Sequence, residues 1–314
     1  MSDFDVVIIG GAAAGLTAAM YAARRKMKTV VITKDTGGQS AMATWFENYP
    51  GFLRITGPKL MQRFERNARK SGAEIVFDEV NGIKENGKSF IVSTATGQNY
   101  QAKSLILTFG KTPKNLEVPG EDKLKGRGVS YCASCDMPLF FSKTIAVVGG
   151  GNSALDAALY GSKGCKKVYL IHRRDQFRGF EYLSDQVKAK KNVEILYNSV
   201  VTEIKGEDRV EGFIVQNTAT NEKREIAVDG IFVEIGHVVK TDFLKPLLQL
   251  NEKGEVIVDL NNATSKPGIF AAGDITQLPV KQTVNAAGDG CKAALAAYNY
   301  VNGIPLDKVT PDWK

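Results

Sequence analysis

Histidine and cysteine are scarce in this 314-residue chain, with two and four residues respectively, and this scarcity excludes most zinc sites. A structural zinc ion takes four Cys or His ligands, whereas the sequence offers one Cys-x-x-Cys, Cys132 and Cys135, and no second pair. We therefore predict no metal site. The pair is typical of a redox-active disulfide, with a zinc site or two inert thiols as the alternatives. Cys165 and Cys291 stand in small, apolar, helical surroundings and are predicted to be buried core thiols.

Long hydrophobic runs are also lacking. Residues 6–23 carry no charge over eighteen positions, about the length that spans a membrane, but glycine and alanine make up much of that segment. The residues before it include Asp3 and Asp5, where an export signal carries basic residues. We therefore predict neither a membrane span nor an export signal, and a cytoplasmic location.

The composition shows no extreme that points away from a globular protein. It is 43% hydrophobic and 24% charged, which excludes disordered, fibrous and integral-membrane classes. The net charge of +7 is spread along the chain without a basic stripe and interleaved aromatics, so we predict no nucleic-acid partner. Glycine alone is enriched, at 31 residues, which indicates several tight turns.

An internal repeat organises the chain. The segment from Val6, VVIIGGAAAGLTAAMYAARRKMKTVVIT, aligns without a gap on the segment from Ile145, IAVVGGGNSALDAALYGSKGCKKVYLIH. Each copy reads as an apolar strand, a glycine turn, an alanine-rich helix and a second apolar strand. Each is therefore predicted to be one βαβ unit of about thirty residues.

The glycine turn of each copy predicts a dinucleotide site. A helix that enters directly from a strand aims unpaired N–H groups and its positive end at a pyrophosphate, provided that no Cβ blocks the approach. The second copy matches Gly-x-Gly-x-x-Ala fully over Gly149–Ala154, whereas the first, Gly10–Gly15, has Ala12 at the position of closest approach. Two motifs in register favour two nucleotide sites over the alternative, a structural or decayed repeat.

The two copies differ at the end of the second strand, where the ribose is read. The first ends in Thr33-Lys34-Asp35, without a carboxylate at the expected position. The second ends in HRRDQFR, with Arg173, Arg174 and Arg178 clustered about twenty residues beyond the glycines. Guanidinium groups bind phosphate in a bidentate manner, so the second site is predicted to prefer NADPH; the alternative is a solvated basic face.

A downstream segment indicates that the first nucleotide is FAD. Residues 268–276, GIFAAGDIT, read as a short apolar strand ending in Gly273-Asp274, whose carboxylate can accept hydrogen bonds from a ribityl chain. A long helix is predicted to open at Gln282, with its N-terminus placed to stabilise a reduced flavin. Both ends of the chain thus serve FAD, and we predict an α/β fold in which an NADPH-binding domain, 114–242, is inserted into an FAD-binding domain, 1–113 and 243–314. Each domain is predicted to be Rossmann-like, with a three-layer ββα architecture.

Over essentially its whole length the chain resembles the low-molecular-weight flavoprotein thioredoxin reductases. The motifs that carry the resemblance are GGAAAGLTAA, GGQ, ENYPG, GRGVSYCASCD, GGGNSALDAA, HRRDQFR, FAAGD and KQTVNAAGDGC. The most discriminating is Cys-x-x-Cys-Asp just ahead of the second glycine motif. The chain departs from the family pattern at Ala12 and at Met137-Pro138, where a glycine-aromatic pair is expected.

The resemblance implies roles for individual residues. Cys135 lies nearest the flavin, Cys132 attacks the partner disulfide, and Asp136, the acid beside the pair, moves the proton; a helix-start cap is the alternative for Asp136. Gln39 and Asn48 contact the isoalloxazine.

The resemblance also implies partners and a movement. They are a homodimer, a thioredoxin or thioredoxin-like protein as substrate, and rotation of the inserted domain between half-reactions. The residues that match partner-contact positions are Arg127, Phe140 and Phe141.

The predicted cofactor residues follow the motifs above. For FAD they are Gly10, Ala12, Ala13, Ala14, Gly15, Thr33, Lys34, Gly38, Gln39, Asn48, Gly273, Asp274, Lys281, Gln282 and Thr283. For NADPH they are Gly149, Gly151, Asn152, Ser153, Ala154, His172, Arg173, Arg174 and Arg178.

Two other functions compete with an NADPH-dependent thioredoxin reductase. One is a flavoprotein of the same build that serves another acceptor, such as a glutaredoxin-like protein disulfide oxidoreductase, a peroxiredoxin-type partner or a small dithiol. The other is a redox-sensing flavoprotein that turns over slowly, which only Ala12 favours.

Overall fold

A computed structural model describes residues 2–43, 45–239, 241–306 and 308, and the chain in it divides into two compact units. Unit 1 comprises residues 1–111 and 239–314, and unit 2 comprises residues 112–238. Unit 2 is thus inserted into unit 1 in the sequence. The boundaries predicted from the sequence lie within a few residues of these divisions.

Unit 1 is built on a seven-stranded sheet in the order β3-β2-β1-β6-β5-β4, with β17 also paired to β6. Strands β1, β2, β3, β6 and β17 are parallel, and β4 and β5 form an antiparallel edge. The elements of this unit are β1 Ser2–Gly11, α1 Ala13–Arg24, β2 Thr29–Thr36, α2 Gly38–Met42, α3 Gly57–Lys70, β3 Glu74–Phe77, β4 Val80–Asn86, β5 Ser89–Thr94, β6 Asn99–Leu107, η2 Asp242–Leu244, β17 Ile269–Ala271, η3 Gly273–Ile275 and α8 Thr283–Val301.

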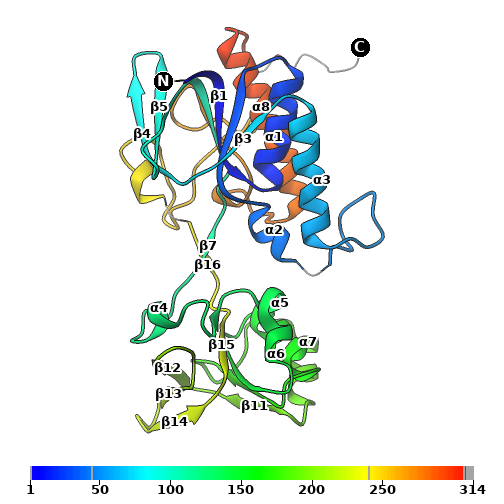
Figure 1. Ribbon diagram of the computed structural model, residues 1–314, viewed down its shortest axis with the longest axis vertical. Coiled ribbons are helices and arrows are strands. Elements are labelled where there is room, and N and C mark those ends of the chain that lie inside the picture. Colours follow the sequence, from blue (N-terminus) through cyan, green and yellow to red (C-terminus); the bar gives the residue numbers. More distant parts are fainter. Residues whose placement is uncertain (1, 44, 240, 307, 309–314) are drawn as a thin grey trace. The chain divides into compact units, whose positions relative to one another are not determined.

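Strand β1 shows why the first apolar run becomes a central strand. Val6 and Ile8 enter the apolar cluster on one face of the sheet, and Val7 and Ile9 enter the cluster on the other. A strand that is covered on both faces is hydrophobic at every position, as expected in a parallel sheet. Figure 1 shows α1, α3 and α8 side by side on one of these faces.

Small residues allow α8 to approach α1 closely. A Cβ added at Gly290 of α8 would lie 2.1 Å from the backbone oxygen of Ala14. The alanines and glycines of both helices therefore serve helix packing, which brings the start of α8 to the glycine turn that precedes α1.

Unit 2 contains a second sheet of parallel strands, in the order β11-β10-β9-β15-β8, and an antiparallel sheet β12-β13-β14. Apolar clusters fill both faces of its parallel sheet. The elements are β7 Thr112–Pro113, α4 Glu121–Leu124, β8 Val129–Ser130, α5 Ala133–Asp136, η1 Met137–Phe140, β9 Thr144–Val148, α6 Asn152–Ser162, β10 Lys167–Ile171, α7 Glu181–Lys188, β11 Val193–Leu196, β12 Ser199–Lys205, β13 Gly212–Asn217, β14 Lys223–Ala227, β15 Gly230–Val233 and β16 His237–Val238.

The structure confirms the predicted fold class and the repeat. The first copy forms β1-α1-β2 and the second forms β9-α6-β10, each with its two strands parallel and adjacent. The two segments that enter and leave unit 2 pair as antiparallel strands, with Thr112 opposite Val238 and Pro113 opposite His237. Across the described residues, no helix is long and apolar enough to cross a membrane.

Candidate active site

The first glycine turn is shaped by protein packing at two of its glycines. Gly10 has φ of +113°, and an added Cβ would lie 2.6 Å from the backbone oxygen of Thr108 at the end of β6. A Cβ at Gly15 would lie 1.8 Å from the backbone oxygen of Gly10. Both glycines are therefore needed to let α1 follow directly from β1.

Thr33 and His172 occupy equivalent places in the two copies of the repeat. The Thr33 hydroxyl accepts a hydrogen bond from the Gly11 amide at 2.9 Å, and a Cβ on Gly11 would collide with that side chain. The His172 ring packs in the same way under Gly150, where a Cβ would lie 2.2 Å from it. Both side chains are buried. These side chains pack against the glycine turns and stabilise them, a role that the sequence did not reveal.

The second turn leaves one glycine without a packing reason. A Cβ at Gly149 would lie 2.3 Å from the backbone oxygen of Glu234, whereas a Cβ at Gly151 would meet no described atom within 4 Å. Ala12 and Gly151 precede α1 and α6, and neither makes a side-chain capping hydrogen bond to the first amides of its helix. Such uncapped amides at a helix start can bind an anion. These turns fit the pyrophosphates of two dinucleotides.

Gly151→Ala tests this interpretation directly. The variant is expected to fold with unchanged thermal stability, because the added methyl group meets no protein atom. It should raise KM for NADPH about tenfold or more, because the Cβ points to where the pyrophosphate approaches. Thermal unfolding and steady-state kinetics measure the two effects.

Gly149→Ala is the matched control for that variant. Here the Cβ collides with the backbone of Glu234, so stability itself should fall. If Gly151→Ala left KM for NADPH unchanged, the second turn would not bind the nucleotide.

Four separate segments meet at the carboxyl end of the unit 1 sheet, as the FAD prediction requires. Ser40 and Thr283 share a hydrogen bond between their hydroxyl groups at 3.0 Å. The Asn48 amide donates to the Gln282 side chain at 3.2 Å, and the Gln39 amide donates to the backbone oxygen of Lys111 at 2.9 Å. Side-chain hydrogen bonds thus join the KQT motif to the ENYPG motif and to Ser40, the residue directly after GGQ, while GGQ itself contacts the backbone of Lys111.

Gly273 and Asp274 complete this region. Gly273 has φ of +76°, and an added Cβ would lie 3.2 Å from the Cβ of Ala14 and 3.3 Å from that of Ala286. The turn therefore lies between the first residues of α1 and of α8. Of the remaining predicted FAD residues, Ala13 and Ala14 are buried in the first turn of α1, and Gly38 opens α2 beside Ala12. Lys34 forms an exposed ion pair with Glu79, and no described contact joins it to this turn.

A buried carboxylate, Glu255, lies beside Lys281 at the start of α8. Glu255 accepts a hydrogen bond from Lys111 at 2.8 Å and lies 3.6 Å from the Lys281 amine. Burial alone raises the pKa of Glu255, but hydrogen bonds from Lys111 and Asn251 and the Lys281 charge outweigh it and hold the pKa below its usual range. Lys281 also donates to the backbone oxygens of Asp274 and Thr276. Lys281, which is predicted to lie beside FAD, is thus fixed in position by contacts with the protein.

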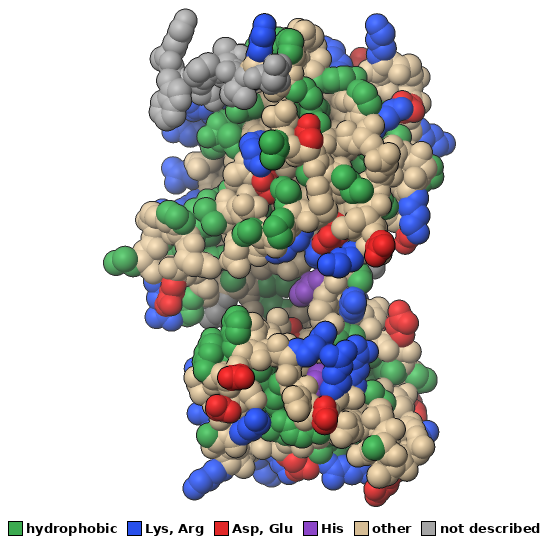
Figure 2. Space-filling model, turned by 180° about the vertical axis from the view of Figure 1, so that it is seen from behind, with side chains coloured by type: hydrophobic (Ala, Val, Ile, Leu, Met, Phe, Trp, Pro, Cys, Tyr) green, Lys and Arg blue, Asp and Glu red, His purple; other side chains and the backbone are tan. Residues whose placement is uncertain are grey.

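The three predicted arginines of the NADPH site gather round His172. Arg173, Arg174 and Arg178 are exposed, and the Arg178 amide donates to the backbone oxygen of Gly150 at 2.7 Å, which ties the arginine segment to the glycine turn. Burial, together with the three guanidinium charges, lowers the pKa of His172, whose Nε2 bonds to the backbone oxygen of Gln176. Figure 2 shows the Lys and Arg cluster on this unit, with a histidine partly visible beneath it.

Two further residues of the predicted NADPH site open α6. The Asn152 side chain accepts a hydrogen bond from the Phe180 amide at 2.8 Å, so it fixes the loop that carries the arginines. Ser153 is exposed at the first turn of α6.

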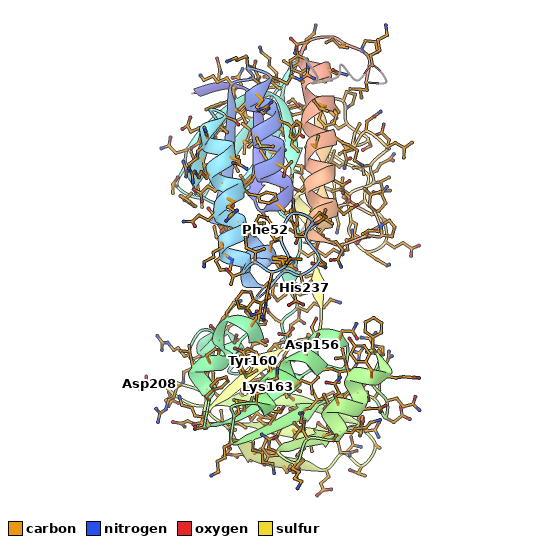
Figure 3. All side chains as sticks on the ribbon, turned by 90° about the vertical axis from the view of Figure 1, so that its right-hand side faces the viewer. Phe52, Asp156, Tyr160, Lys163, Asp208 and His237 are labelled. Carbon is orange, nitrogen blue, oxygen red and sulfur yellow. A yellow bond between two sulfur atoms is a disulfide. The ribbon has the colours of Figure 1, made fainter. Side chains whose placement is uncertain are left out.

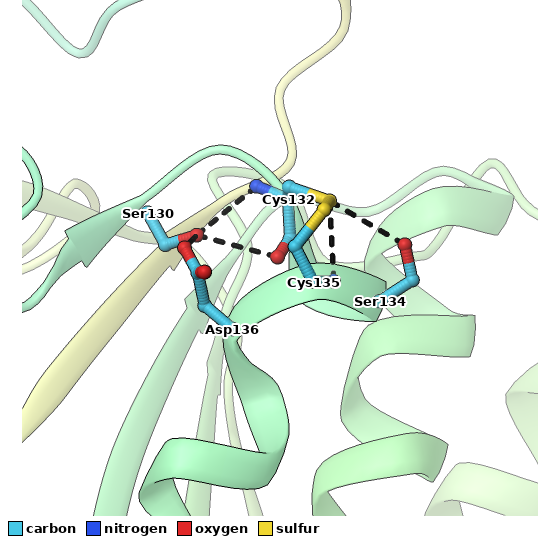
Figure 4. Close-up of a disulfide and its surroundings, with 5 residues drawn as sticks. All are labelled: Ser130, Cys132, Ser134, Cys135 and Asp136. Atoms are coloured by element: carbon cyan, nitrogen blue, oxygen red, sulfur yellow. Dashed lines mark hydrogen bonds between the residues drawn. A yellow bond between two sulfur atoms is a disulfide. The ribbon is translucent and has the colours of Figure 1, made fainter. Parts of the chain in front are cut away.

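Cys132 and Cys135 form a disulfide at the start of α5, with a Cα–Cα distance of 5.4 Å (Figure 4). The Cys132 sulfur accepts a hydrogen bond from the Cys135 amide at 3.2 Å and lies 3.4 Å from the Ser134 hydroxyl. The predicted pair is therefore brought together and is surrounded by donors that can stabilise a thiolate on Cys132.

Asp136 ends α5 on the side of the pair away from Ser134 (Figure 4). Its carboxylate accepts a hydrogen bond from the Ser130 hydroxyl at 2.6 Å, and the same hydroxyl accepts from the Cys132 amide at 3.1 Å. Although Asp136 precedes η1, its side chain makes no capping hydrogen bond there within the described structure. The side chain thus contacts Ser130, a residue that the sequence motif had not singled out, and the proton-transfer role of Asp136 stays a prediction.

The prediction for the other two cysteines is partly wrong. Cys165 is buried, and burial raises the pKa of its thiol to about 11, but it lies in the turn after α6 and not on a helix. Cys291, on α8, is only half-buried. Met137 is fully buried, with its sulfur 3.8 Å from that of Cys165, so this departure from the family pattern serves the core of unit 2.

The predicted partner-contact residues differ in exposure. Arg127 is exposed and Phe141 is 41% exposed, whereas Phe140 packs edge-to-face on Phe232 at 5.4 Å between ring centroids. Arg127 and Phe141 therefore keep a surface that a partner can contact, and Phe140 belongs partly to the core.

Sequence reasoning missed Glu234, which follows β15 directly. Burial raises its pKa to about 7, and a hydrogen bond from the Ala133 amide opposes part of that rise. The available signal was a lone charge at the end of the apolar run GIFV. Within the described part of the chain, no group of three or more His, Cys, Asp or Glu side chains could hold a metal ion.

Comparisons with known proteins identify relatives along the whole chain. The family model for pyridine nucleotide-disulphide oxidoreductases matches residues 4–290. A thioredoxin reductase of Peptoclostridium acidaminophilum is 40% identical, over 95% of this chain and 97% of that protein. A component of the alkyl hydroperoxide reductase of Pseudomonas putida is 38% identical, over 95% of this chain and 58% of its own length. Among solved structures, Lactococcus lactis thioredoxin reductase aligns with a TM-score of 0.85 and 37% identity, over 96% of this chain and all of that one.

Proposed function

Because the chain belongs to the pyridine nucleotide-disulphide oxidoreductases and, within them, to the thioredoxin reductases, we propose that it passes electrons from NADPH through FAD and the Cys132–Cys135 disulfide to the disulfide of a thioredoxin-like protein. The observation that carries the proposal is the redox pair itself, placed directly ahead of the second nucleotide fold. The enzyme is thus an NADPH-dependent flavoprotein that acts on a sulfur group.

The residues of unit 1 are proposed to hold FAD. The amides that open α1 would bind the pyrophosphate, Asp274 would accept from the ribityl chain, and Gln39 and Asn48 would orient the isoalloxazine. Bound FAD supplies two-electron transfer between a nicotinamide and a disulfide. The first turn of α8, which begins at Thr283, would contribute partial positive charge to the bound flavin.

The residues of unit 2 are proposed to bind NADPH and to carry out the thiol chemistry. Opening the disulfide takes up two electrons and leaves one sulfur as a thiolate and the other as a thiol. Asp136, oriented by Ser130, delivers or removes the proton at the sulfur of Cys135, and the thiolate of Cys132 attacks the disulfide of the partner.

We also propose that unit 2 rotates on its two connections between half-reactions. The redox pair and the nicotinamide site both belong to unit 2, and each must reach the same flavin. The connections are paired strands, β7 and β16, so a small change beside this pair can turn the unit as one body. Trapping two orientations with engineered disulfides would test the movement.

The panel that tests the function contains the thioredoxin-like proteins, glutaredoxin-like oxidoreductases and peroxiredoxin-type proteins of the source organism. Reduction of each is followed by NADPH oxidation with the FAD-loaded enzyme. A thioredoxin is expected to be the best substrate. Preference for a peroxiredoxin-type acceptor would instead support the alternative that the relationship to an alkyl hydroperoxide reductase raises. Flavin bleaching without steady turnover would indicate a sensor.

The proposed assembly is a homodimer in the cytoplasm. NADPH and reduced thioredoxin-like proteins belong to reducing compartments, where a Cys-x-x-Cys is catalytic and not structural. Light scattering of the FAD-loaded protein is expected to give twice the monomer mass of 34.1 kDa.

Nucleotide choice gives a prediction that is independent of the partner. Replacing Arg173 and Arg174 with glutamine is expected to raise KM for NADPH by at least about tenfold, or about 1.4 kcal/mol. The exposed guanidinium groups gain a dianionic partner only when the 2′-phosphate is present. KM for NADH should barely move, and the preference for NADPH should shrink as ionic strength rises. Equal losses for both nucleotides would show that the arginines serve the fold or the pyrophosphate.

A further inference from the structure

Glu234 lies on the strand that neighbours the redox pair. Strand β15 pairs in parallel with β8, with Phe232 opposite Ser130. The residues that follow the two strands therefore leave the sheet at the same end. On β8 these residues lead to Cys132, and on β15 they lead to Glu234. The fold therefore brings this carboxyl group to the segment that carries the disulfide.

The contact between them is specific. The Glu234 carboxyl accepts a hydrogen bond from the backbone amide of Ala133, the residue directly after Cys132. The backbone of Glu234 is fixed as well, because its amide donates to the backbone oxygen of Val148 at 2.8 Å and its backbone oxygen packs against the Gly149 turn. The position of the carboxyl group is thus set by the sheet and not by a flexible loop.

The ionisable groups of the surrounding elements are few. The segment 131–136 contributes Tyr131, Asp136 and the two cysteines, and α6 contributes Asp156 and Tyr160 (Figure 3). The spans of β8, β9 and β15 contain no ionisable side chain. Beyond these elements, Lys114 and His237 accompany the segment that follows Glu234, since the Lys114 amide donates to the backbone oxygen of Gly236 at 2.9 Å. Burial disfavours the charged form of the Glu234 carboxyl group. The hydrogen bond from the Ala133 amide links a change of charge at Glu234 to the redox segment.

We propose that Glu234 acts on the redox pair as a titratable positioning residue: its carboxyl group anchors the Ala133 amide, and its negative charge, when present, disfavours a thiolate on the adjacent Cys132. The inference rests on the proposed redox role of the pair. Around neutral pH Glu234 changes between its two forms. When it is protonated, Cys132 can lose its proton to solvent without opposition from a charge on Glu234. When it is ionised, the two negative charges oppose each other.

The test uses FAD-loaded protein carrying Cys135→Ser, so that Cys132 is the single thiol of the pair, reduced with dithiothreitol in the absence of NADPH. The rate of iodoacetamide alkylation of Cys132 is followed by peptide mass spectrometry from pH 5.5 to 10. With Glu234→Gln added, the amide oxygen still accepts from Ala133, but no charge can form. The apparent pKa of Cys132 is expected to fall by about half a unit or more, with rates that agree with the parent protein below pH 6 and exceed it about threefold near pH 8.

The matched control is Asp229→Asn. Asp229 precedes the same strand, and its carboxylate also accepts a backbone hydrogen bond, from Thr144 at 2.9 Å. It lies at the opposite end of the strand from Glu234. It should leave the alkylation profile unchanged. Glu234→Leu, which removes both the charge and the hydrogen bond, should reduce thermal stability, whereas Glu234→Gln should not.

A Glu234→Gln profile that coincides with the parent at every pH would overturn the proposal and leave Glu234 as a structural acceptor. Equal shifts in Glu234→Gln and Asp229→Asn would also overturn it. Because the alkylation of Cys132 in the Cys135→Ser protein needs no electron transfer from NADPH, a shifted profile together with failure of NADPH to reduce the Cys132–Cys135 disulfide of the unsubstituted protein would instead count against the proposed function alone.

Discussion

Replacing Cys132 or Cys135 with serine is expected to abolish reduction of a thioredoxin-like protein while NADPH still reduces the flavin. The two sulfurs form one disulfide, so neither alone can accept two electrons and hand them to a second disulfide. The nucleotide turns lie outside the replaced residues, so flavin reduction should proceed at its normal rate. Anaerobic stopped-flow spectroscopy measures the first step, and NADPH oxidation with a thioredoxin measures the whole reaction.

The two single variants should differ from each other. In Cys132→Ser, the remaining Cys135 is expected to perturb the flavin spectrum, because it is the sulfur assigned to the flavin. In Cys135→Ser, the remaining Cys132 should form a stable mixed disulfide with a partner. Cys165→Ser is the control, since that thiol is buried in the core of unit 2 and should leave turnover unchanged. More than a trace of thioredoxin turnover in Cys132→Ser would contradict the dithiol mechanism.

The second large effect is expected at Asp136. Asp136→Asn should slow electron passage between flavin and disulfide by about 10²-fold or more, which corresponds to about 2.7 kcal/mol of activation free energy. Asparagine can still accept the Ser130 hydrogen bond but cannot exchange a proton at neutral pH. The content of FAD should not change.

Asp208→Asn provides the control for charge alone. Asp208 is an exposed aspartate of the same unit (Figure 3), and its replacement should leave every step unchanged. Ser130→Ala separates orientation from proton transfer, because it removes the hydroxyl group that holds the carboxylate. We expect it to cost less than Asp136→Asn. A near-normal rate in Asp136→Asn would return Asp136 to a structural role.

Much of the architecture could be predicted because its signals are local. The direct entry of α1 and α6 from β1 and β9 depends on backbone conformations that glycine adopts, and Gly10 and Gly149 stand where those conformations are required. Unbroken apolar runs indicate central parallel strands, because such strands are covered on both faces. The Cys-x-x-Cys spacing places two sulfurs within reach of each other on a single turn of chain.

Residues far apart in the sequence come together only through packing, and there the sequence was insufficient. The close approach of α8 to α1 carries Gln282 and Thr283 to ENYPG and to Ser40, the residue after GGQ. The register of β15 on β8 carries Glu234 to the Ala133 amide. The degree of burial was decided in the same way, since neighbours on other elements determine it. Cys165 and Met137 are therefore covered in the core of unit 2, while Cys291 is left half-buried on α8. Adjacent residues determine the local backbone conformation, whereas burial, charge and proton affinity depend on elements that meet only in the folded chain.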